Sequence, residues 1–271
     1  AIGNGALNAN STGSYNTAVG NSALGSYTGD SNTAIGYDCL QACTGGSNTA
    51  VGYQAGEKDT TGSENVLIGI VAGEEITTGI QNTAIGSDSL GANQTGNYNT
   101  ALGKGALQVY TGSQNTALGR SALGSNTGSS GCTAVGYKSA ENATANYTTA
   151  VGDRSMAGAT VTGEHNTAVG HYTLYNLTSG TRNTGAGSNA LASISTGDDN
   201  TSLGYNALGA TSTGDNNTAV GAYAGDANTT GTNNTSIGYQ ALTAATTATE
   251  NTALGARALA ANTGEANTAV G

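Results

Sequence analysis

A pentapeptide of the form Asn-Thr-Ala-aliphatic-Gly recurs along the whole chain of 271 residues and constrains its fold more than any other feature. A fixed period of this length is typical of repeat architectures, in which each unit packs only against its neighbours. We therefore interpret residues 1–271 as a single continuous repeat array without a second domain, and expect it to be a segment of a longer polypeptide. The glycines that close the pentapeptide are Gly3, Gly20, Gly36, Gly52, Gly69, Gly86, Gly103, Gly119, Gly136, Gly152, Gly170, Gly187, Gly204, Gly221, Gly238, Gly255 and Gly271.

The repeat length of about 17 residues is too short for a pair of helices, which needs about 33 residues or more. Each unit instead contains two short apolar stretches, Thr-Ala-aliphatic and Ala-Leu, and glycine follows the first of them. This pattern favours two short strands and two turns in each unit. If each unit is one coil and successive coils pair in parallel, the fold is all-β. The sequence thus predicts a parallel β-solenoid of about 16 coils.

Side chains alternate across a strand, so Thr and the aliphatic residue are expected on one face and Ala on the other. Equivalent residues of successive coils would then stack into columns. The Asn column could form a ladder of amide hydrogen bonds, or each Asn could lie solvated in a left-handed turn. Gly would supply a positive φ or a close backbone approach. The predicted structural ladder is represented by Asn16, Thr17, Val19, Gly20, Asn32, Thr33, Ile35, Gly36, Asn217, Thr218, Val220 and Gly221.

The core of one coil is expected to be thin, with one Val, one Leu and two Ala. Such a core offsets little of the conformational entropy that 17 ordered residues lose. Self-association that covers the Ala face would deepen the core. The sequence therefore predicts a homotrimeric rod, in which small side chains let three chains approach closely.

Composition argues against several functions. The net charge of -10 disfavours nucleic acid, and no apolar run is long enough to predict membrane insertion. Metal ligands at characteristic spacing are not evident around the histidines or cysteines. We predict no catalytic, cofactor-binding or metal-binding residues and no enzyme, although the acidic turn before Asn could hold occasional cations. The histidines are His165 and His171, and the cysteines are Cys39, Cys43 and Cys132. The acids of the turn before Asn are Asp30, Glu64, Glu164, Asp198, Asp199, Asp215, Glu250 and Glu265.

Tyrosine follows the closing glycine in several units, which leaves two interpretations. An exposed row of Tyr rings could stack on sugar rings, or each ring could cover the edge of its coil and the neighbouring coil. These residues are Tyr37, Tyr53, Tyr137, Tyr205 and Tyr239.

The unit Asn-Thr-Ala-Val-Gly…Ala-Leu resembles the head repeats of trimeric autotransporter adhesins and, more closely, the Gly/Asn/Thr repeats of phage tail fibres. The resemblance extends over all 271 residues. It implies a β-roll, left-handed in the adhesins, and assembly as a trimer. It also implies a fibre shaft or head for surface attachment, located outside the cell or on a virion, with a cell-surface glycan or receptor as partner.

Three other functions remain open on the sequence. A flat Thr column could bind ice, although each unit offers only one Thr per strand. A tail-spike fibre could depolymerise a polysaccharide with a pair of carboxylates. The chain could also be the subunit of a filament whose segments join end to end.

Overall fold

The computed structural model describes residues 1–26, 28–125 and 127–271. The chain divides into two compact units, Ala1–Ala134 and Val135–Gly271, which are described separately. Every regular element in the described residues is a strand of three residues. No helix that could cross a membrane occurs in the part of the chain that the structure describes.

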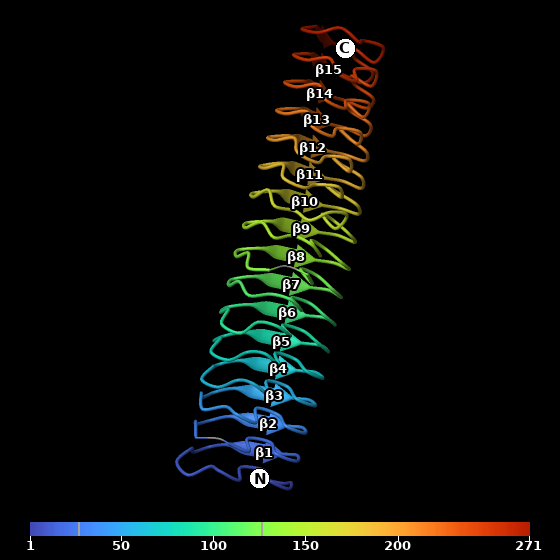
Figure 1. The fold of residues 1–271 in the computed structure, drawn as a ribbon. Helices are drawn as coiled ribbons and strands as arrows, with labels where there is room; N and C mark the ends of the chain where they lie inside the picture. Colours follow the sequence, from blue (N-terminus) through green and yellow to red (C-terminus); the bar gives the residue numbers. More distant parts are fainter. Residues whose placement is uncertain (27, 126) are drawn as a thin grey trace. The chain divides into compact units, whose positions relative to one another are not determined.

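In the first unit, seven strands pair in parallel and in chain order (Figure 1). They are β1 (Thr17–Val19), β2 (Thr33–Ile35), β3 (Thr49–Val51), β4 (Val66–Ile68), β5 (Thr83–Ile85), β6 (Thr100–Leu102) and β7 (Thr116–Leu118). An eighth strand, β8 (Thr133–Val135), contains the boundary between the units.

In the second unit, strands β9 to β16 also pair in parallel and in chain order. They are β9 (Thr149–Val151), β10 (Thr167–Val169), β11 (Thr184–Ala186), β12 (Thr201–Leu203), β13 (Thr218–Val220), β14 (Thr235–Ile237), β15 (Thr252–Leu254) and β16 (Thr268–Val270). Both units are therefore all-β parallel β-solenoids, and the fold class predicted from the repeat is confirmed.

Strand register stays constant although the coils differ in length. Thr33 pairs with Thr49 and Thr149 pairs with Thr167, which are 16 and 18 residues apart. A shift of one residue within a strand would turn every side chain to the opposite face. The extra residues therefore lie outside the strands, as the sequence predicts.

The Ala-Leu stretch is not a strand, so the prediction of two strands per coil is wrong. Its leucines adopt left-handed backbone conformations, with φ of 51° at Leu24 and 48° at Leu40. This conformation interrupts an extended chain. The Ala-Leu stretches of successive coils are still joined by backbone hydrogen bonds. Leu24 N–H donates to Cys39 O at 3.1 Å, and Leu40 N–H donates to Ala55 O at 3.0 Å.

The core lies inside each coil, between the central residue of the strand and the Ala-Leu pair. Ala34 and Leu40 are fully buried, whereas Ile35 is 41% exposed. Thr and the aliphatic residue do share one face, as predicted. However, the expectations that the aliphatic residue fills the core and that the Ala face is open to partners are wrong. The interior is narrower still in β11, where a Cβ built on Gly185, at the position that is Ala in most strands, would overlap Leu174 Cδ1.

One coil reverses the usual distribution of large and small residues. β4 carries Leu67 where most other strands have Ala. Gly56 and Gly73 stand where many other coils have the core Leu, and a Cβ on either would come within 2.7 Å of a Leu67 methyl group. The larger strand residue thus fills the space that two smaller residues leave, which maintains close packing.

Candidate functional site

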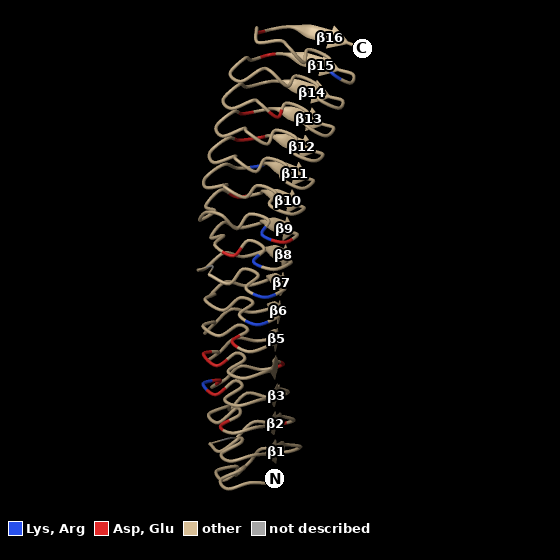
Figure 2. Ribbon diagram, turned by 90° about the vertical axis from the view of Figure 1, so that its right-hand side faces the viewer, with Lys and Arg blue, Asp and Glu red and all other residues tan. Residues whose placement is uncertain are grey.

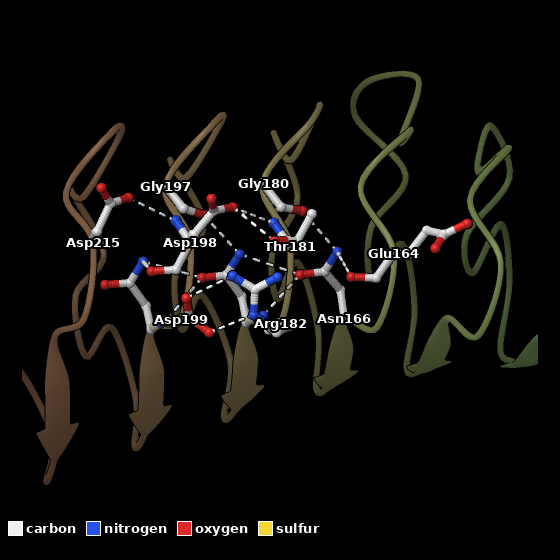
Figure 3. A network of polar contacts seen from close by, with 11 residues as sticks. Glu164, Asn166, Gly180, Thr181, Arg182, Gly197, Asp198, Asp199 and Asp215 are labelled. Atoms are coloured by element: carbon white, nitrogen blue, oxygen red, sulfur yellow. Dashed lines mark hydrogen bonds and ion pairs between the residues drawn. The ribbon is translucent and has the colours of Figure 1, made fainter.

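The Asn column forms a buried ladder of hydrogen bonds in each unit. Asn200 is representative: its Oδ1 accepts both the backbone N–H of Asn217 and Asn217 Nδ2, each at 3.0 Å. Asn200 Nδ2 donates to Gly214 O at 2.8 Å, in the next turn. Each side chain thus satisfies backbone groups of the next coil, which would otherwise be costly to bury. Figure 3 shows this ladder at Asn166.

The structure places the predicted ladder residues in three different environments. Asn16, Asn32 and Asn217 belong to the amide ladder, with Asn32 N–H donating to Asn16 Oδ1 at 2.9 Å. The closing glycines have positive φ, and a Cβ on Gly36 would overlap the carbonyl oxygen of Gly52. The other members lie on the outward face of the sheet: Thr17, Val19, Thr33, Ile35, Thr218 and Val220. Gly20 and Gly221 resemble Gly36.

The amide ladder changes where Asn is replaced. Cys132 still donates its backbone N–H to Asn115 Oδ1 at 2.8 Å, in the first unit. In the second unit, Thr148 is buried and its Oγ1 has no hydrogen-bond partner. A buried hydroxyl without a partner destabilises the fold, so the Asn side chain is better suited to this position.

Two further ladders were not anticipated from the sequence. In one, a hydroxyl donates to the carbonyl of the equivalent residue in the next coil: Thr178 to Ser195 at 2.9 Å and Ser195 to Ser212 at 3.0 Å. In the other, the side chain two residues before Asn accepts a backbone N–H: Asp198 Oδ1 accepts that of Thr181 at 2.6 Å. The frequent Asp, Ser, Asn and Thr at this position were the available signal.

The acidic turn is therefore largely structural. Asp215 Oδ1 accepts the N–H of Asp198 at 2.8 Å, and Asp30 Oδ1 accepts that of Ser14 at 2.7 Å. The Arg182 guanidinium binds both carboxylate oxygens of Asp199 (Figure 3) and lowers the pKa of that carboxyl. No group of three or more His, Cys, Asp or Glu suited to a metal ion occurs among the described residues.

The Tyr column follows the strands along one edge of each coil. Tyr37 and Tyr53 stack with ring centroids 5.3 Å apart and an angle of 9° between the rings. One face of each ring lies against the other ring, while Tyr37 and Tyr53 are still 48% and 49% exposed, so both edge covering and stacking on sugar rings remain predictions. At Tyr137 the Arg154 guanidinium lies 5.3 Å from the ring centroid, a cation–π contact. Tyr205 and Tyr239 each meet Tyr223 edge to face.

The histidines and cysteines are not brought together into one site. His165 stacks on Tyr147 with centroids 5.1 Å apart, whereas His171 Nε2 lies 3.3 Å from Asp153 Oδ2. Cys39, Cys43 and Cys132 are buried, and none of the three is joined in a disulfide. Burial raises the pKa of the Cys39 and Cys43 thiols to about 12, so both are protonated at neutral pH.

The outward face of the sheet is a regular surface, because equivalent residues recur on it from strand to strand. We define the outward strip as the first and third residues of strands β1–β7 in the first unit and of β9–β16 in the second. Each strand offers one Thr, or Val66 in β4, and one aliphatic residue or Ala186. Surface pockets are absent from the described residues, so this strip and the turns are what each unit presents to partners.

Comparisons with family models, curated proteins and solved structures find no match to this chain. The geometry of the coils therefore carries the functional argument.

Proposed function

We propose that this chain is a structural and adhesive fibre module, a shaft or head that holds a binding surface outside a cell or on a virion and associates with other copies of itself. The observation that carries this proposal is the buried Asn ladder. It recurs in both units and joins each coil to the next through side-chain and backbone hydrogen bonds together.

A module of this kind gains stability with every added coil, because each coil satisfies the polar groups of its neighbours. The charged residues lie on the connections between strands, where they keep the acidic chain soluble (Figure 2). The described part of the chain combines ladders, outward strip and charged turns without a concave site. These features support a role that depends on the exposed surface of the coils and on their number, and not on catalysis.

A bead assay tests this function. Beads coated with the chain should be retained on immobilised cell-surface glycans or on extracts of membrane proteins. Beads coated with an unrelated protein of equal negative charge should not be retained. The same polysaccharides are then assayed for new reducing ends. Release of reducing sugar would instead favour the depolymerase, and absence of retention on every surface would remove the adhesive part of the proposal.

The outward Thr column favours ice binding as a second candidate function. This Thr faces outward, and Thr201 and Thr252 are exposed on the sheet. A regular array of Thr and methyl groups with a rung spacing of about 4.8 Å could order water. Thermal hysteresis at micromolar protein would support this function, and its absence would exclude it.

A further inference from the structure

In the outward strip the third residue of every strand is apolar, and it lies beside a column of Thr that is interrupted by Val66. The third strand residue is 41% exposed at Ile35, 52% at Leu203 and 44% at Leu254. Scattered apolar residues on a surface need no explanation, but a contiguous row marks an interaction site. In the first unit the row is widest at β4, where Val66 replaces Thr and Ile70 is exposed just beyond the strand.

The strip carries no charge, whereas the chain as a whole is strongly acidic. None of the described strands contains Lys, Arg, Asp or Glu. Figure 2 shows these residues on the connections between strands. Two copies with a net charge of -10 each repel one another, so contact is least unfavourable where both surfaces are neutral. A neutral apolar surface on every copy therefore favours another copy as the occupant.

The size of the strip agrees with this occupant. Outward residues of one strand are roughly 7 Å apart and rungs are about 4.8 Å apart. With side-chain radii included, each unit offers on the order of 400 Å² of planar area by this spacing. Two copies that face one another through one such unit each would bury about 800 Å² in total, a size typical of weak, transient association.

We propose that the outward strip is the surface through which copies of this chain associate. The proposal rests on the structural function above and replaces the Ala face that the sequence suggested, since Ala18, Ala34 and Ala50 are buried inside their own coils. Because equivalent residues recur at equal rung spacing, the aliphatic row of one copy can pack between the Thr and aliphatic rows of another. The Thr side chains are small enough to allow close approach and keep a hydroxyl for hydrogen bonding.

The test changes the strip in the second unit and measures mass in solution. Leu203→Lys combined with Leu254→Lys places two charges on the strip. The matched control, Asn216→Lys combined with Asn233→Lys, adds the same charge in an exposed turn column that already holds Arg182. Sedimentation equilibrium from 0.1 to 100 µM should give the same oligomer for wild type and control. The strip variant should dissociate with a Kd raised by at least about 100-fold, the effect expected of charge buried in an interface.

A milder pair, Leu203→Thr with Leu254→Thr, guards against misfolding, because Thr is already tolerated on this face. It should weaken association with an unchanged far-UV circular dichroism spectrum. An oligomer that resists both strip variants would overturn the assignment of the surface but leave the fibre function standing. A wild type that is monomeric at 100 µM would also overturn it. If that monomer is still retained in the bead assay, the adhesive function survives without association.

Discussion

Replacing Asp59 with Asn should remove the pH dependence that one buried carboxyl gives to the stability of the fold. Asp59 is fully buried, and its Oδ1 accepts the backbone N–H of Gly62 at 2.8 Å. Burial raises the pKa of this carboxyl from 3.8 to about 7, more than these hydrogen bonds lower it. Asn93 makes the same contact with the N–H of Gly96 at 2.6 Å. A neutral amide therefore fits this position in another coil.

The sign follows from proton binding. Between about pH 4 and pH 7 the native state holds a proton that the unfolded chain has released, so stability falls as pH rises through this window. Three pKa units correspond to about 4 kcal/mol. The new amide N–H₂ needs an acceptor, and Asn93 Nδ2 has none, which costs about 1–3 kcal/mol. Asp59→Asn should thus be about 1–3 kcal/mol more stable than wild type at pH 8, and less stable at pH 4.

Urea unfolding followed by circular dichroism from pH 4 to pH 8 measures this difference. Glu265→Gln, a change at a fully exposed acid, serves as control and should follow the wild-type curve. The reasoning would be refuted if the curves of wild type and Asp59→Asn ran parallel over the whole range, because the carboxyl would then titrate at its ordinary value.

Three further changes test the packing and the ladders. Asn200→Ala should lower the free energy of unfolding by about 2–6 kcal/mol, because it leaves buried groups of two coils without partners; Thr213→Ala, at an exposed turn position with an ordinary backbone, should change it by less than about 0.5 kcal/mol in the same urea titration. Leu67→Ala should cost about 2–5 kcal/mol through the cavity it creates, and adding Gly73→Leu should restore part of this loss; additive effects in calorimetry would argue against the compensation. Gly36→Ala should prevent the first unit from folding normally, seen as lost protection in hydrogen exchange, since the new methyl group would overlap the next coil.

The sequence indicates the period, the parallel order of coils and the strand that begins at each Thr, because a strict column is visible without knowledge of the coil's cross-section. It does not indicate which face turns inward. Alternation puts Ala34 opposite Ile35, and hydrophobicity alone assigns Ile35 to the core. The structure does the reverse: Ala34 and Leu40 are buried, whereas Ile35 is 41% exposed.

The left-handed leucines were also unpredictable from residue preference, because φ above zero is rare for Leu. Their signal was indirect: Gly56 and Gly73 share the column with Leu, and glycine is common where φ is positive. For the ladders, the Asn column points to stacked amides. A single sequence does not show that the Asn200 side chain would hydrogen-bond both to backbone groups and to another Asn side chain. Its partners depend on where the next turn places Gly214 O.

The Asn ladder gives each coil a direction. Each Asn side chain of the ladder accepts a backbone N–H from the coil that follows, and its own backbone N–H is donated to the Asn of the preceding coil, so the junctions between Asn-bearing coils of a unit are chemically alike. A whole rung could be duplicated or lost in evolution without leaving a mismatched junction. The number of coils can therefore vary freely in this architecture, whereas the number of residues within a strand cannot.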